Sequence, residues 1–461
     1  MRVQNGSRLI HLRAGVLRNQ GYESDCSRAL LNAVNEEFNK IIRARREQMT
    51  TTIYPESIAV KSGATRLASI DILRGLTMTM MIFVNELAGV KGLPWWNYHM
   101  KAEIDAMTYV DMVFPFFLFI VGLSLPIAMR ARLKRNPSLP ALWMHVALRT
   151  ASLMTLGLIL ANADDGDGSR MFLQPAVWAI VGLTGCALFL NEYGPSERYA
   201  SVFRWLRIVG LALVVAMFAI FRHTPNPGHG SGYGSWIDFG YPEILGLIGY
   251  TYFAVCILYI PTRRWLWAPF AWFIAMMAFN ALTAAKWITF ADRLPYWFWP
   301  FSNGAMAGIM FAGIVTSIIF LGAHRWQTLR QKTLLGVSFG IAALIAGWLL
   351  TPLGISKIRA TPTWSLYSIG AAVLLFTALY WICDVKKKTG WAFFARPAGA
   401  NTLTTYLLPD FWYYIFAAAG IRYFDTHFVV GLPGAVRCAV FTAFILAVAA
   451  VLTRWRVRLR L

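Results

Sequence analysis

Charged residues are scarce in this sequence, and apolar residues dominate it. Only 14% of the 461 residues are Asp, Glu, Lys or Arg, whereas 57% are hydrophobic, and the mean hydropathy is +0.51. One soluble core cannot bury so much apolar surface. The composition therefore excludes a soluble globular protein and predicts an all-α, polytopic membrane protein.

Acidic residues are scarcer than basic residues, 22 against 43, so the formal net charge is +21. Such an excess is also found in proteins that bind nucleic acids. Here, however, the Lys and Arg residues form short clusters between apolar segments rather than a patch on a soluble domain. We therefore interpret the charge as a signal of membrane topology and expect no nucleic-acid partner.

Cysteine is also rare. The five cysteines stand singly, four of them in apolar segments, and the sequence has no CxxC motif and no Cys/His pairing. They are Cys26, Cys186, Cys256, Cys383 and Cys438. The sequence therefore predicts neither a disulfide nor a metal site.

The first 61 residues lack an apolar run long enough for a secretory signal peptide. Between residues 30 and 46, apolar residues recur at helical spacing opposite three arginines, which fits an amphipathic helix on an anionic membrane surface. The alternative, which we favour, is a dispensable leader with the true start at Met49. We thus divide the chain into a basic leader, residues 1–65, and a transmembrane domain, residues 66–461.

Apolar segments recur along the rest of the chain, and each approaches the roughly 20 helical residues that a bilayer requires. They lie near 70–90, 109–129, 141–161, 172–190, 205–221, 243–260, 266–285, 304–323, 334–350, 365–383, 401–419 and 436–453. The sequence therefore predicts about 12 transmembrane helices.

Basic residues follow every second segment. The clusters lie at 130–135, 198–207, 263–264, 325–332, 386–388 and 454–460. Cytoplasmic loops are enriched in Lys and Arg. We therefore expect both termini in the cytoplasm and the loop that carries His99 on the outer side.

A histidine and several acids precede the second segment, in the stretch from His99 to Met129. Asp111 lies at the edge of the apolar run, where an ionisable side chain is costly and indicates a functional site. Capping of the helix is its alternative role. Imidazole titrates near neutral pH and can act as a general base or a nucleophile, so His99 is a catalytic candidate. An inert loop histidine is the alternative.

Aromatic residues gather in the connections expected on the outer side. Trp95, Trp96 and Tyr98 precede His99, and others lie at 223–236 and 296–299. Aromatic rings pack on the apolar faces of sugars, but Trp and Tyr also populate membrane interfaces. Their concentration beside His99 favours a sugar-binding role there.

Polar residues also occur within the first and third segments. Arg74 lies three residues after Asp71, which predicts a local ion pair or, alternatively, a phosphate ligand at the inner surface. Asn85 lies roughly 15–20 Å farther along the same helix, close to the level of His99. Arg149 either binds a ligand or extends to lipid phosphates.

Several separated motifs, in order, resemble those of heparan-alpha-glucosaminide N-acetyltransferase and its bacterial relatives among the transmembrane acyltransferases. The likeness runs from about Arg66 to the last segment. The motifs are RLASIDILRGLTMTMMIFVNELAG, a His, DAMTYVDMVFPFFLFIVGLSLP, YPEILGLIGYTYF, GISKIRATPTWSLYS and RPAGANTLTTYLLP.

The resemblance implies transfer of an acetyl group from cytosolic acetyl-CoA to a sugar amine or hydroxyl on the outer side, without a metal. By motif, the family's active-site histidine falls on His99, although a strict register places Lys101 at that position, and the polar residue that closes its first span falls on Asn85. With Asp111, singled out above by its place at the edge of the apolar run, these are the predicted catalytic residues. The predicted acetyl-CoA-binding residues are Arg74, Arg149, Ser365 and Asn401. Ser365 and Asn401, like Asn303 and Tyr406, line a channel in this interpretation and hold helices together in the alternative.

The expected partners are acetyl-CoA, a small sugar or cell-envelope saccharide, and the lipid bilayer of a bacterial inner membrane; a homodimer is compatible with them. The chief alternative is a secondary transporter for a sugar or another small solute, because span count and intramembrane polar residues do not separate the two. The sequence shows no internal repeat relating its halves, which favours the acyltransferase. A non-catalytic scaffold is a third class.

Overall fold

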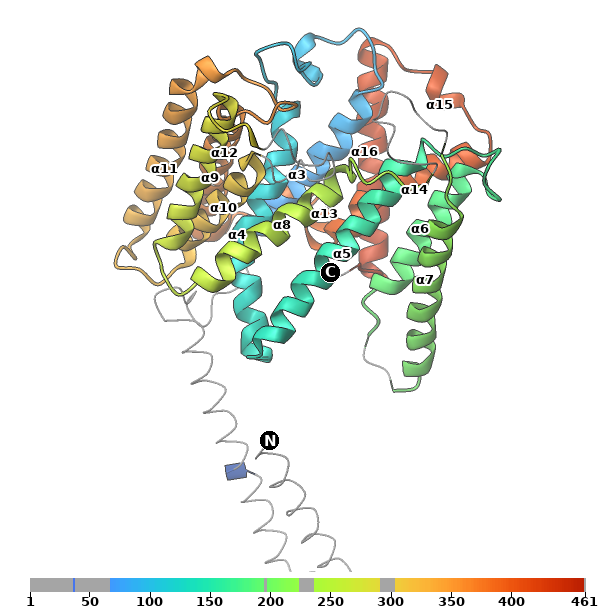
Figure 1. Cartoon of the computed structure of the whole chain (residues 1–461), viewed down its shortest axis with the longest axis horizontal. Helices are drawn as coiled ribbons and strands as arrows, with labels where there is room; N and C mark the ends of the chain where they lie inside the picture. The colour runs from blue at the N-terminus through green and yellow to red at the C-terminus, as the bar shows by residue number, and fades with distance from the viewer. Residues whose placement is uncertain (1–35, 38–66, 195–196, 224–235, 291–302, 460–461) are drawn as a thin grey trace, which may run out of the picture.

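The computed structural model describes residues 36–37, 67–194, 197–223, 236–290 and 303–459 (Figure 1). Most of the leader lies outside these ranges, as does its predicted amphipathic helix apart from residues 36–37. So do the aromatic residues at 296–299 and most of the loop at 223–236.

The described part of the chain contains twelve helices of 16 residues or more, one for each apolar segment that the sequence predicts. They are α3 Ala68–Leu87, α4 Val113–Arg135, α5 Leu139–Ala163, α6 Pro175–Leu190, α7 Ala200–Ile220, α8 Glu243–Thr262, α9 Ala268–Ala284, α10 Ala305–Leu321, α11 Leu329–Leu349, α12 Pro362–Leu379, α14 Thr402–Ala418 and α16 Gly431–Arg454. Two short helices complete the list: α13 Arg396–Ala400 precedes α14, and α15 Tyr423–Thr426 lies between α14 and α16.

Seven of the helical segments in the described ranges are long and apolar enough to cross a membrane. They are those of α4, α5, α7, α8, α11, α12 and α16. In the same ranges the β interactions are isolated bridges and form no strand. The predicted all-α, polytopic membrane fold is confirmed.

Local sequence explains where several helices begin. Ser138 and Thr361 cap α5 and α12 by accepting hydrogen bonds from backbone amides three residues later, and a proline follows in the first turn of each helix. The carboxylate of Asp384, which lies after α12, accepts hydrogen bonds from the amides of Ala68 and Ser69. Thus a residue distant in sequence caps α3, the first of the twelve long helices.

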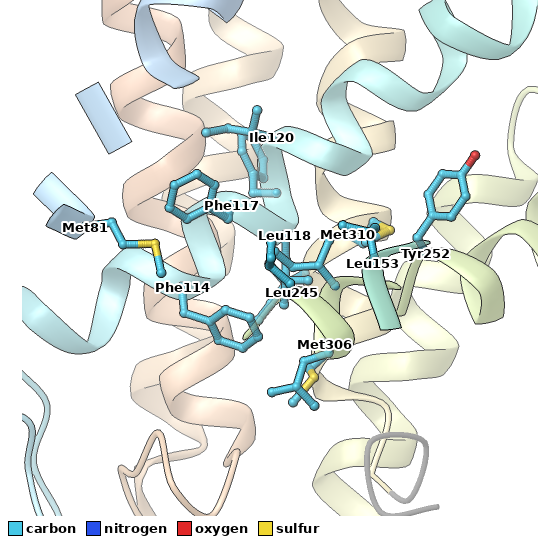
Figure 2. Close-up of a cluster of buried hydrophobic side chains, with 14 of the residues drawn as sticks. Met81, Phe114, Phe117, Leu118, Ile120, Leu153, Leu245, Tyr252, Met306 and Met310 are labelled. Carbon is cyan, nitrogen blue, oxygen red and sulfur yellow. The ribbon is translucent and has the colours of Figure 1, made fainter. Parts of the chain in front are cut away.

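Helices α4 and α10 form a packed pair, which we call the central helix pair because most residues of both helices are buried. Figure 2 shows Phe114, Phe117 and Leu118 of α4 in the same buried cluster as Met306 and Met310 of α10. Glycines let the two backbones approach closely, because a Cβ atom added at Gly122 would overlap the carbonyl oxygen of Met310. Small residues serve this purpose commonly in membrane bundles.

The connections between helices gather at two opposite ends. Residues 88–112 join residues 354–361 and 427–431 at one end, the upper end in Figure 1, which we call the His99 end. The basic connections lie at the other end, where Asn191 pairs with Leu459 of the tail. We call it the basic end. That the basic end faces the cytoplasm remains a prediction.

Candidate active site

The loop that carries His99 joins α3 to α4 and has its own internal hydrogen bonds. The hydroxyl of Tyr98 donates to the carbonyl of Val90 at 2.8 Å and accepts from the amide of Leu93 at 2.9 Å. Thr108 Oγ1 donates to the carbonyl of Tyr98 at 2.9 Å. These bonds hold the neighbour of His99 against both ends of the loop.

His99 and Asp111 form a hydrogen-bonded pair. His99 Nδ1 lies 2.7 Å from Asp111 Oδ1; the His99 side chain is 41% exposed and that of Asp111 only 1%. Asp111 Oδ2 accepts from the amides of Thr108 at 3.0 Å and Met100 at 3.4 Å. A carboxylate beside Nδ1 favours the proton on that nitrogen, which leaves Nε2 as the basic nitrogen of His99.

Asp111 is also fixed from a distant helix. The indole Nε1 of Trp364, in the first turn of α12, donates to the backbone carbonyl of Asp111 at 3.0 Å. Trp364 is buried, with 1% of its surface exposed. The acid of the pair is therefore held by its own loop and by α12, so it can orient the imidazole precisely.

Lys357 is a residue of this site that the sequence reasoning did not single out. Its Nζ atom lies 3.4 Å from each ring nitrogen of His99. Burial lowers the pKa of Lys357, while the charges of Asp111 and Glu243 act to raise it. Lys357 lies within GISKIRATPTWSLYS, one of the motifs that carry the family resemblance, and this motif could have indicated it as a site residue.

An ion pair ties the loop of Lys357 to the loop of His99. The guanidinium of Arg359 donates to Asp105, and Asp105 also accepts from the amide of Ile355 at 3.1 Å. The hydrogen bond from Arg359 holds the pKa of the Asp105 carboxyl below its usual value. Lys357 lies between Ile355 and Arg359, the two residues of its loop that contact Asp105. These two contacts therefore position the ammonium group of Lys357.

A cavity of about 510 Å³ lies among the halves of α3, α8 and α14 that are nearer the His99 end. Its lining residues are Met78, Met81, Ile82, Asn85, Glu86, Gly89, Leu160, Asp164, Glu243, Tyr406, Pro409, Asp410, Tyr413, Tyr414, Phe424, Val429 and Arg437. Four acids and one arginine therefore face a space large enough for a small ligand.

The acids of the cavity come from four different parts of the chain. Tyr406 donates through its hydroxyl to the carboxylate of Glu243, with both oxygens at 2.9 Å, and Tyr413 donates to Glu86. Burial raises the pKa of Asp164, just beyond α5. Glu243 has a φ of 55°, a conformation that costs free energy in a residue other than glycine. The fold therefore holds this carboxylate against a local preference.

Asn85, the third predicted catalytic residue, lines this cavity from the end of α3. Lys357 interacts electrostatically with both Asp111 and Glu243. Lys101, the alternative to His99, is exposed in the loop.

Two of the predicted acetyl-CoA ligands are arginines within helices. Arg74 forms the ion pair with Asp71 that its spacing predicts, at 3.2 Å, and donates to Ser124 Oγ at 2.9 Å. The guanidinium of Arg149 lies 4.8 Å from the centre of the Tyr252 ring, and its Nε is buried without a hydrogen-bond partner. Arg149 therefore has a donor that no group of the protein accepts from.

The other two predicted ligands have partners within the protein. Ser365 Oγ is buried and donates to the carbonyl of Thr361 at 3.1 Å. Asn401 donates to the carbonyl of Val457 at 2.8 Å and accepts from Thr404 Oγ1 at 2.6 Å. These contacts fit the helix-packing alternative. Within the described ranges no group of three or more His, Cys, Asp or Glu residues could hold a metal ion.

Comparison with known proteins shows relatives of this chain. The chain is 28% identical to the heparan-alpha-glucosaminide N-acetyltransferase of Mus musculus over 244 residues, which are 48% of this chain and 36% of that protein. It is 29% identical to the Homo sapiens protein of that name over 244 residues, 48% of this chain and 35% of the human protein. The chain thus spans about a third of the length of these relatives.

Residues 66–297 match the family described as a domain of unknown function, DUF5009. This range contains His99, Asp111 and Glu243, whereas Lys357 lies beyond it. The match covers half of the chain, and the likeness to the two acetyltransferases agrees with the resemblance in the sequence motifs. The chain is a relative of these acetyltransferases and belongs to the DUF5009 family.

Proposed function

We propose that this protein is a transmembrane acetyltransferase. It takes an acetyl group from cytosolic acetyl-CoA and transfers it to the amine or hydroxyl of an amino sugar or other saccharide at the His99 end. In this proposal the basic end faces the cytoplasm of a bacterium, with both termini inside. The name of the two relatives, which specifies N-acetyl transfer to a glucosaminide, supports this choice.

The observation that carries the proposal is the 2.7 Å contact between His99 and the buried Asp111. An imidazole whose Nδ1 is held by a buried carboxylate is a general base at Nε2. Because His99 is 41% exposed, an acceptor can reach that nitrogen. A structural histidine would need neither the exposure nor the fixed carboxylate.

The reaction follows from this arrangement. His99 Nε2 removes the proton from the acceptor nitrogen or oxygen as that atom bonds to the thioester carbonyl carbon. The carbon–sulfur bond then breaks, and the imidazolium returns the proton to the leaving sulfur. The Lys357 ammonium and the Asn85 amide are donors for the oxyanion that forms on the carbonyl. In the alternative sequence of steps, His99 carries the acetyl group itself before the acceptor takes it.

The donor substrate would enter from the basic end. Arg74 and Arg149, together with Ser365 and Asn401, are the residues we assign to acetyl-CoA. A guanidinium suits phosphate oxygens because of its planar set of donors. The unpartnered Nε of Arg149 supports its part in this assignment. Ser365 and Asn401 would need to exchange their present partners for the ligand.

Substitution of His99 tests the proposal. We expect His99→Ala to retain acetyl-CoA binding and to lose acetyl transfer by a factor on the order of 10²–10⁴ if His99 is a general base. If it carries the acetyl group, the loss is larger and labelled acetyl remains on the wild-type protein when no acceptor is present. His427→Ala, an exposed histidine elsewhere at the same end, is the control. Transfer by His99→Ala at the wild-type rate would disprove both mechanisms.

The acidic cavity supports a second candidate, a proton-coupled transporter of a sugar or another small solute. Glu243 and Asp410 face this cavity, and carboxylates inside membrane bundles are typical of proton pathways. Uptake of a labelled amino sugar into proteoliposomes without acetyl-CoA would favour the transporter. Acetylated product formed only with acetyl-CoA would favour the acetyltransferase.

A further inference from the structure

An apolar groove of about 740 Å³ lies between α14 and α16. Its lining residues are Glu86, Trp412, Tyr413, Phe416, Phe424, Phe428, Leu432, Pro433, Val436, Arg437, Val440, Phe441 and Phe444. Aromatic and aliphatic side chains make up nearly all of this lining. The groove therefore offers a hydrocarbon surface rather than a site for a sugar.

The groove adjoins the acidic cavity. Glu86, Tyr413, Phe424 and Arg437 line both spaces. One ligand can therefore occupy the polar cavity with one part and the apolar groove with another. Such a ligand must be amphipathic.

The groove faces outward, toward the surroundings of the bundle. Leu432 is 74% exposed, Val440 64% and Val436 53%. All three residues lie in the first turns of α16. These turns lie at the His99 end, because Lys91 pairs with Val430 directly before α16. In a membrane the groove would open to the hydrocarbon of the leaflet on the His99 side.

Arg437 lies where the two spaces meet. Its guanidinium donates to the carbonyl of Phe424 at 2.7 Å, while its Nε is buried without a hydrogen-bond partner. An unpaired buried donor costs free energy, so a ligand atom that accepts from it would be stabilising. The linkage oxygen of an amphipathic glycoside would lie at this junction.

We propose that the acceptor is a lipid-linked saccharide, whose sugar occupies the acidic cavity and whose hydrocarbon chain lies in the groove between α14 and α16. This inference rests on the proposed acetyltransferase function and specifies its substrate class. The lateral opening lets the lipid enter from the leaflet without leaving the membrane. Two acids that face the cavity near the sugar, Glu243 and Asp410, suit its amine and hydroxyl groups.

Photolabelling tests the placement of the chain. The probe is dodecyl 2-amino-2-deoxyglucoside with a diazirine at the end of its chain, used on the full-length protein in membranes without acetyl-CoA. We expect labelled peptides from residues 412–444, and we expect excess unlabelled glycoside to suppress the label. A phosphocholine with the same chain is the comparison probe. Equal labelling by that probe, with no competition from the glycoside, would show that ordinary lipid alone fills the groove and would overturn the inference.

Substitutions of residues that line the groove provide a second test of the inference. Val440→Trp fills it, and Val436→Trp does so independently if the first variant folds poorly; Val451→Trp, on the same helix outside the groove, is the matched control. Because the hydrocarbon chain of the probe can no longer enter the groove, labelling by the glycoside is expected to fall at least about tenfold in the first two variants. Labelling of the control variant should not change. Unchanged labelling in both groove variants would refute the inference.

The outcome separates this inference from the function on which it rests. Competed labelling of the groove without acetyl transfer to any glycoside would remove the acetyltransferase proposal and leave the lipid site. Acetyl transfer at equal rates to methyl and dodecyl aminoglucosides, without groove labelling, would remove the lipid site and leave the acetyltransferase.

Discussion

The Nζ atom of Lys357 lies 3.4 Å from both ring nitrogens of His99, although the two residues are 258 positions apart in the chain. The pairing exists because Asp105 holds Arg359 and Ile355 on either side of the lysine. It brings a cation to the imidazole that Asp111 orients. The site thus consists of two loops from opposite halves of the chain.

Lys357→Met is expected to leave the thermal midpoint at pH 7 at least as high as that of the wild type while acetyl transfer falls. Burial lowers the pKa of this lysine, so the folded site disfavours the ammonium that the unfolded chain carries. The wild type should therefore gain stability relative to the variant as pH rises toward the ordinary pKa of 10.5. Thermal unfolding in detergent at several pH values measures this, with exposed Lys386→Met as control. A large loss of stability at pH 7 would contradict the assignment.

Asp111→Asn should reduce acetyl transfer by a factor on the order of 10²–10⁴, because the amide no longer holds the proton on Nδ1 of His99. Binding of acetyl-CoA should stay near that of the wild type. The double variant with His99→Ala should be no worse than His99→Ala alone, since Asp111 acts through the imidazole. Additive losses in the double variant would show an independent role for Asp111.

Asp105→Asn should lower the thermal midpoint at neutral pH, because Arg359 loses its carboxylate. The folded pKa of Asp105 is depressed, so its contribution to stability is present above the usual value of 3.8 and is lost as pH falls through the lower folded value. The difference from the wild type should accordingly shrink below that window. Glu103→Gln, an exposed acid of the same loop, serves as the control. A difference that persists in acid would show that the effect is not the charge of Asp105.

Gly122→Ala should destabilise the protein by roughly 1–3 kcal/mol, since the new methyl group would overlap the carbonyl of Met310 and force α4 from α10. Gly390→Ala adds its methyl group in open space and should have little effect. Thermal unfolding of the two purified variants in the same detergent compares them. Equal midpoints would mean that the central helix pair packs less closely than described.

Cysteine introduced at Lys101 should react with a membrane-impermeant maleimide on intact cells, whereas cysteine introduced at Lys387 should not. The first position lies at the His99 end and the second among the basic connections. Wild-type protein controls for the native cysteines, of which the four in the described ranges are buried. The reverse pattern would invert the proposed orientation and with it the two-sided reaction.

The sequence alone determined the helices and singled out His99 and Asp111 as candidates, but it did not predict the contact between them. Apolar runs have a length that sequence composition reveals directly, which is why each of the twelve predicted segments corresponds to a helix. His99 and Asp111 are only 12 positions apart in one loop, so local reasoning could single out both. The ion pair of Asp71 and Arg74 is likewise a matter of helical spacing.

Only the tertiary structure decided which distant residues join that pair. Glu243 and Tyr406 are 163 positions apart and meet because α8 and α14 turn particular faces toward one cavity. The rotation of a helix about its axis depends on how side chains interlock with neighbouring helices, and in spans apolar on every side the hydrophobic pattern carries little information about it. For the same reason Lys357 remained one lysine among many until the packing of α12 against α4 placed its loop over His99.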